Sequence, residues 1–283
     1  MLFRSHLSPL MKYIPSSVIE AGLKLKHPFK VSHITGLKSP YAEAEGWFIG
    51  CPLTAKQMVE LPEEFVMDRI IQSGQVAQEL GAKIVGLGAF TSIVGDAGIT
   101  VAKNLDIAVT SGNSYTVATA IQGTKEAAEM MGKNLKECRA VVVGATGSIG
   151  AASVRLLAKE VKHITLVARH MGPLEELAQE LISKNHCEVA ISQDIHASLK
   201  EADIVITVTS ALDFLIEPGD LKPGAVVCDV ARPRNVSREV SLQRNDVLVI
   251  EGGVINVPGN VDFHFNFSKP SAVKIVSFVA IFL

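Results

Sequence analysis

A seven-residue turn at residues 144–150 constrains the fold of this chain more than any other segment. Its sequence is Gly-Ala-Thr-Gly-Ser-Ile-Gly, and it follows the apolar run 140–143 and begins a helical pattern. Glycines at a strand–turn–helix junction let backbone N–H groups approach phosphates, and the helix N-terminus adds partial positive charge. The strict Gly-x-Gly-x-x-Gly spelling is not met, because Ala145 stands at its first glycine position. The alternative is an ordinary buried turn without a ligand. The segment predicts a site for a dinucleotide pyrophosphate formed by Gly144, Thr146, Gly147, Ser148, Ile149 and Gly150.

Strand and helix patterns alternate after the turn, which predicts a parallel sheet covered on both faces. Strands are expected at 163–168, 202–209, 224–229 and 246–250, and a helix at 173–183. We therefore expect an α/β protein with a Rossmann-type nucleotide domain.

The first half of the chain predicts a smaller α/β unit. Strands are expected at 47–51, 83–88 and 106–110, and helices at 62–80 and from the Ser111–Ser114 quartet through Met131. The predicted domains are 1–131 on the substrate side, 132–267 for the nucleotide, and an atypical tail at 268–283.

The end of the second nucleotide-domain strand indicates which coenzyme is bound. An NAD site usually carries Asp or Glu there, roughly 20 residues after the turn. This chain has Arg169 followed by His170 instead. Because a guanidinium pairs well with a ribose 2′-phosphate, we expect NADP(H), although a solvated strand-end charge is the alternative for Arg169.

Other polar and glycine residues at predicted strand ends mark a crevice between the two units. The residues expected beside the coenzyme are Ser210, Gly252 and Gly253, and those expected in a substrate pocket are Ser92 and Asn113. For each hydroxyl or amide the alternative is a cap or turn residue. Asp229 and Arg232 suit either a structural ion pair or substrate contacts.

Charge and composition exclude several classes of function. With 27 basic and 29 acidic residues, the 283-residue chain has no basic footprint for nucleic acid. Its four cysteines are scattered and its eight histidines lack metal-ligand spacing, so a reducing cytoplasm is expected and metal catalysis is not. No signal peptide or transmembrane segment is expected. The apolar residues 275–283 are too few to span a bilayer and predict a buried strand or an incomplete helix.

Five motifs in this order resemble one family. They are residues 88–94, 110–116, 144–150, 167–169 and 251–254. The resemblance begins between residues 40 and 50 and extends to Phe267. The family is that of long-chain acyl-(acyl carrier protein) reductases, often labelled predicted amino-acid dehydrogenases. The nucleotide domain is also similar to those of shikimate dehydrogenases and glutamyl-tRNA reductases.

The resemblance implies a role in lipid metabolism, in two chemical steps. A cysteine thiolate attacks a fatty acyl thioester of acyl carrier protein or coenzyme A, and NADPH then reduces the enzyme-bound thioester to a fatty aldehyde. The family's nucleophile follows the segment matching 260–267, but no cysteine occurs here after Cys228. We therefore expect a truncated or frame-shifted copy. Cys51 is the fallback nucleophile, and its alternative is a small buried core residue.

Three functions remain open from the sequence. The first is an NADPH-dependent acyl-thioester reductase, impaired by the missing nucleophile. The second is hydride transfer without a thiol, as in shikimate or amino-acid dehydrogenases. The third is a non-catalytic dinucleotide-binding protein. Chain length of the acyl group, identity of its carrier and oligomeric state have no signal in the sequence.

Overall fold

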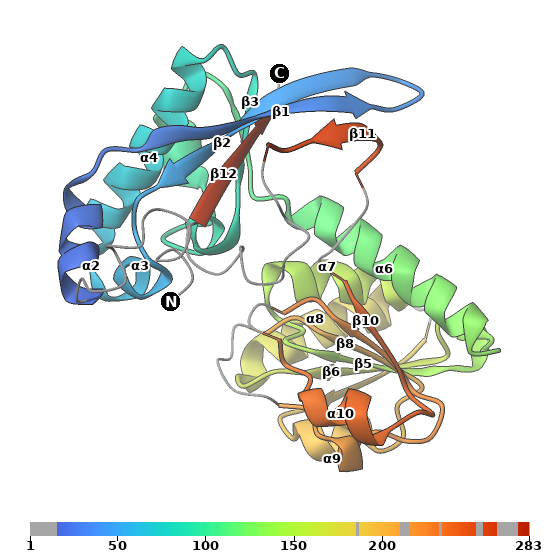
Figure 1. Ribbon diagram of the computed structural model, residues 1–283. Helices are drawn as coiled ribbons and strands as arrows, with labels where there is room; N and C mark the ends of the chain where they lie inside the picture. The colour runs from blue at the N-terminus through green and yellow to red at the C-terminus, as the bar shows by residue number, and fades with distance from the viewer. Residues whose placement is uncertain are drawn as a thin grey trace. The chain divides into compact units, whose positions relative to one another are not determined.

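The computed structural model describes residues 16–184, 187–209, 215–231, 234–252, 257–264 and 277–282. The chain divides into two compact units, Met1–Gly112 with Asn256–Leu283 and Asn113–Ile255 (Figure 1). These bounds differ from the predicted domains, because helix α6 (Asn113–Met130) packs on the second unit and the chain after that unit returns to the first.

The second unit is built on a six-stranded sheet in which every strand pair is parallel. The order across the sheet is β10-β9-β8-β5-β6-β7. The strands are β5 (Arg139–Val143), β6 (His163–Val167), β7 (Glu188–Ser192), β8 (Ile204–Thr207), β9 (Val226–Asp229) and β10 (Leu248–Glu251). This is the order of a doubly wound Rossmann sheet. Successive strands are added on one side of β5 up to β7 and on its other side from β8 onward, so the switch point lies between β5 and β8. The predicted fold class is confirmed.

Both faces of this sheet are buried, as the predicted strand patterns require. In β5, Ala140 and Val142 belong to one core cluster, whereas Val141 and Val143 belong to another. Side chains of α6, α7 and α8 fill the first cluster, and side chains of α9 and α10 contribute to the second. The other helices of this unit are α7 (Ser148–Leu157), α8 (Met171–Lys184), α9 (Ile195–Leu199), α10 (Arg238–Gln243) and the short 3-10 turns η3 (Leu135–Glu137) and η4 (Pro218–Asp220).

The first unit contains a mixed six-stranded sheet in the order β11-β1-β2-β12-β3-β4. The strands are β1 (Phe29–Lys38), β2 (Glu43–Cys51), β3 (Ile84–Leu87), β4 (Ala108–Thr110), β11 (Gly259–Asp262) and β12 (Ser277–Phe282). Its core joins Ile49, Ile70 and Val85. The helices are α2 (Ser16–Leu25), α3 (Ala55–Glu60), α4 (Glu63–Glu79), α5 (Ile99–Lys103) and the 3-10 turn η2 (Ala89–Ser92).

The last described strand confirms the strand alternative predicted for the apolar C-terminal segment. Strand β12 is antiparallel to both β2 and β3 and lies between them (Figure 1). With β11 and β12 included, the first unit is slightly shorter than the second. Among the described residues, no helix has the length and apolarity needed to cross a membrane.

Candidate functional site

The predicted phosphate turn follows β5 and requires glycine at two positions. Gly144 has a φ of +86°, and its N–H donates to the carbonyl oxygen of Val167 at 2.8 Å, which ties the turn to the end of β6. An added Cβ on Gly150 would lie 2.1 Å from the carbonyl oxygen of Gly144. Glycine at 144 therefore supplies the turn conformation, and glycine at 150 lets α7 pack directly on the turn.

The N-terminus of α7 is open to an anion. Gly147 is its N-cap and is exposed, and no side chain caps the first turn. An added Cβ on Gly147 would meet only the carbonyl oxygen of Gly144, at 3.5 Å. The first N–H groups of a helix lack intrahelical partners and favour negative charge. Thr146 and Ser148 are exposed beside them, whereas Ile149 packs against the core. The residues present thus fit a bound pyrophosphate.

Asn113 lies at this turn, because it is the first residue of α6. Its Nδ2 donates to Oγ of Ser148 at 2.8 Å. Ser92 ends η2 in the first unit and is half-buried. The substrate pocket that the sequence predicts for Ser92 and Asn113 stays a prediction, but Asn113 orients a residue of the phosphate turn.

Arg169 lies two residues beyond β6, on the edge of the sheet where the turn begins. Strands β5 and β6 end level with each other, since Val143 pairs with Val167. Arg169 is exposed, and its side chain forms no ion pair within the described ranges. No carboxylate occupies residues 168–170. Arg169 therefore places an exposed cation at the sheet edge where the turn begins.

Gly252 has a packing reason that the sequence did not predict. An added Cβ would lie 2.6 Å from Sγ of Cys228 and 2.7 Å from Cγ2 of Val230. That side of Gly252 faces the protein core, so packing alone already requires glycine here; its place beside a coenzyme stays a prediction. Ser210 and Gly253, with Arg232, lie outside the described residues.

Burial disfavours the nucleophilic form of the thiols, which weighs against Cys51 as the nucleophile. Cys51 is 0 % exposed, and burial raises its pKa to about 11. Burial likewise raises the pKa of Cys228 to about 11 and raises the pKa of Cys138 and of Cys187. Cys138 is also buried. Since the thiolate is the nucleophilic form, Cys51 is better explained as a core residue.

A polar network that the sequence analysis missed joins the ends of β8 and β9. Oδ1 of Asn235 accepts hydrogen bonds from the hydroxyls of Thr207 and Thr209, at 2.7 and 2.8 Å. The Asp229 carboxylate accepts three backbone N–H groups of the following loop, so it organises that loop. The hydrogen bonds from Thr207 and Thr209 to Asn235 span 28 and 26 residues, and no local pattern indicates them.

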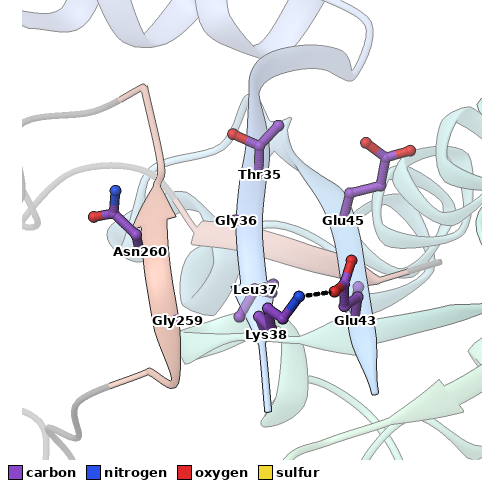
Figure 2. Close-up of a pocket in the computed structure, with 9 residues that line it drawn as sticks. Thr35, Gly36, Leu37, Lys38, Glu43, Glu45, Gly259 and Asn260 are labelled. Atoms are coloured by element: carbon purple, nitrogen blue, oxygen red, sulfur yellow. Dashed lines mark hydrogen bonds and ion pairs between the residues drawn. The ribbon is translucent and has the colours of Figure 1, made fainter. Parts of the chain in front are cut away.

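Elsewhere, the structure shows a shallow hollow of about 650 Å³ between β11, β1 and β2 (Figure 2). Its lining includes the ion pair between Lys38 and Glu43 and the glycines Gly36 and Gly259. None of the predicted site residues lines it. No group of three or more potential metal ligands occurs among the described side chains.

Comparisons with known proteins agree with the topology of the second unit. Residues 125–251 match the family model described as shikimate / quinate 5-dehydrogenase. The second unit is a shikimate dehydrogenase-type Rossmann domain. Such domains bind dinucleotides in oxidoreductases.

Curated relatives match more of the chain at low identity. The aminotransferase PigE of a Serratia species is 31% identical over 228 residues, which are 80% of this chain and 26% of that protein. The long-chain acyl-[acyl-carrier-protein] reductase of Synechococcus elongatus is 29% identical over 212 residues, or 69% of this chain and 58% of the relative. The chain thus spans about a quarter of the first relative and over half of the second.

Other matches cover about half of the chain. A glutamyl-tRNA reductase of Staphylococcus carnosus is 28% identical over 158 residues, 53% of this chain and 34% of that enzyme. The crystal structure of shikimate 5-dehydrogenase from Listeria monocytogenes, in complex with shikimate and NAD, has a TM-score of 0.38 at 21% identity and covers 47% of this chain and 52% of that one.

Proposed function

We propose that this chain is an NADPH-dependent oxidoreductase that reduces a fatty acyl thioester to the aldehyde. The observation that carries the coenzyme part is the glycine turn at the β5–β8 switch point, which leads into the uncapped N-terminus of α7. Arg169, exposed at the end of β6, supports NADPH over NADH. The bound coenzyme supplies the two electrons, and the backbone N–H groups of the turn hold its phosphates.

The substrate class is supported by the acyl-[acyl-carrier-protein] reductase among the relatives. In the overall reaction an acyl thioester, NADPH and a proton give an aldehyde, the free thiol of the carrier and NADP⁺. Acyl carrier protein and acyl-coenzyme A are the two carriers to test. The chain's own residues would bind the coenzyme, orient the acyl group and exclude water that hydrolyses a thioester.

The burial of the cysteines favours a second candidate, hydride transfer without a thiol. Three of the four thiols are buried, and the pKa of every one is raised. A dehydrogenase of the shikimate or amino-acid type needs no thiolate, and residues 125–251 match a dehydrogenase family model.

Two assays separate these functions. Calorimetry with NADPH and NADH tests the coenzyme site, and loss of NADPH absorbance with acyl carrier protein and coenzyme A thioesters tests turnover. Thioester turnover that iodoacetamide abolishes supports a thiolate mechanism, and turnover that resists alkylation supports transfer without a thiol. Saturable binding without turnover identifies a non-catalytic dinucleotide-binding protein. Absence of binding to either coenzyme refutes the proposal.

A further inference from the structure

The amide of Asn235 is held in one orientation at the carboxyl end of β8. Asn235 and Thr207 are both 0 % exposed. Besides the two threonine hydroxyls, Oδ1 of Asn235 accepts the backbone N–H of Thr209 at 3.3 Å. Because a backbone N–H only donates, the oxygen of the amide must face Thr209. Both hydroxyls must then act as donors to the same oxygen.

Asp229 fixes the backbone that presents Asn235. This carboxylate is 2 % exposed, and one of its oxygens accepts the N–H groups of Asn235 and Val236 at 3.0 and 3.1 Å. Its other oxygen accepts the N–H of Ala231 at 3.0 Å. Charge-assisted bonds to backbone N–H groups are strong, so Asp229 holds the backbone of Asn235 and Val236 in place.

Thr209 passes this constraint to the glycine turn. A Cβ added to Gly144 would lie 3.1 Å from Cγ2 of Thr209 and 3.2 Å from its backbone nitrogen. Strands β5 and β8 are neighbours at the point where the sheet order reverses. The contacts therefore run from Asp229 through Asn235 and Thr209 to the first glycine of the phosphate turn.

The choice of an amide at position 235 is informative. Its Nδ2 is buried and has no hydrogen-bond partner among the residues that the structure describes, which is costly for a donor. An aspartate would accept the same three donors without leaving a donor unpaired. A carboxylate, however, would place a second buried negative charge near Asp229 and near a turn that binds phosphates. A neutral acceptor keeps the contacts without repelling an anion.

We propose that Asn235 is a positioning residue of the dinucleotide site, which holds Thr209 against Gly144 while adding no negative charge. The inference rests on the proposed binding of a dinucleotide. Asn235 acts on the coenzyme through Thr209 and not by direct contact.

The test is calorimetric titration of NADPH into the full chain and its variants. Asn235→Ala and Asn235→Asp should each weaken binding by about tenfold or more, the range expected when a buried polar partner is lost. Thr209→Val, which removes the hydroxyl donor but keeps a branched side chain, should weaken it several-fold, and Thr209→Ser should restore it. The matched control is Thr124→Val in α6, which removes a buried hydroxyl bond of 2.7 Å to the carbonyl oxygen of Ala120. It should lower the Tm comparably but leave NADPH affinity within twofold.

The outcomes separate this proposal from the proposed function. If the wild type binds NADPH and a folded Asn235→Ala or Asn235→Asp variant binds it equally well, Asn235 has no positioning role. Should both Asn235 variants fail to fold, equal affinities of Thr209→Val and Thr209→Ser would overturn the proposal. If the wild type binds neither NADPH nor NADH, the proposed function fails and the role of Asn235 fails with it.

Discussion

The same added methyl group should lower thermal stability at one glycine of the phosphate turn and coenzyme affinity at another. In Gly150→Ala the new Cβ would lie 2.1 Å from the carbonyl oxygen and 2.9 Å from the carbonyl carbon of Gly144. Both neighbours are backbone atoms that cannot rotate away, so α7 must shift. Overpacking of this kind costs about 1–3 kcal/mol. At about 2–4 °C per kcal/mol for a protein of this size, the Tm should fall by roughly 2–12 °C.

Gly147→Ala should leave the fold intact and weaken the binding of the coenzyme. The backbone at Gly147 has a φ of −72°, which alanine adopts freely, and the nearest atom to its new Cβ would be 3.5 Å away. Loss of glycine at an N-cap costs less than about 1 kcal/mol. The methyl group would nevertheless occupy the exposed approach to the first N–H groups of α7. We expect NADPH affinity to fall at least about 30-fold, or roughly 2 kcal/mol.

Thermal unfolding and NADPH calorimetry on both variants test this reasoning. Gly172→Ala in α8 is the matched control, because nothing lies within 4 Å of its added Cβ, so its Tm should not fall and its affinity should not change. The argument is refuted if Gly147→Ala binds NADPH like the wild type, or if Gly150→Ala keeps the wild-type Tm.

Three further substitutions test other parts of the structure. Arg169→Asp should reverse the coenzyme preference from NADPH to NADH in competitive titration, and unchanged NADPH affinity would refute the 2′-phosphate assignment. Burial raises the pKa of Asp203, but the N–H of Arg139 at 2.9 Å and the ammonium groups of Lys222 and Lys133 outweigh it and lower that pKa overall. The resulting stability is present above the ordinary carboxyl pKa and is lost as the pH falls through the lower folded one. Asp203→Asn should therefore cost about 1.5–3 kcal/mol in urea unfolding near neutral pH, a difference that should shrink below about pH 4. A constant difference at all pH values would contradict it. Ala97→Gly should stabilise the first unit by about 0.5–1 kcal/mol in the same assay, because Ala97 has a φ of +57°, and lower stability would show that this conformation carries no strain.

Sequence patterns predicted the part of the candidate site that is formed by neighbouring residues. The apolar run of β5, the glycines and the start of α7 are contiguous, so strand, turn and helix propensity acted together at one place. Gly132 likewise ends α6 with a φ of +68°. The pairing of β11 with β1 was missed, since the paired residues lie more than 200 positions apart.

The sequence by itself determined that the second unit is a doubly wound sheet with a glycine turn after its first strand, because hydrophobic period and turn chemistry are properties of neighbouring residues. Only the tertiary structure decided that α6 belongs to that unit, that β12 lies between β2 and β3, and that Cys51 is buried. It also decided that Asn235 reaches Thr209. Each of these depends on which distant segments pack together, and packing partners are selected by the whole core rather than by the residues next to them in the chain.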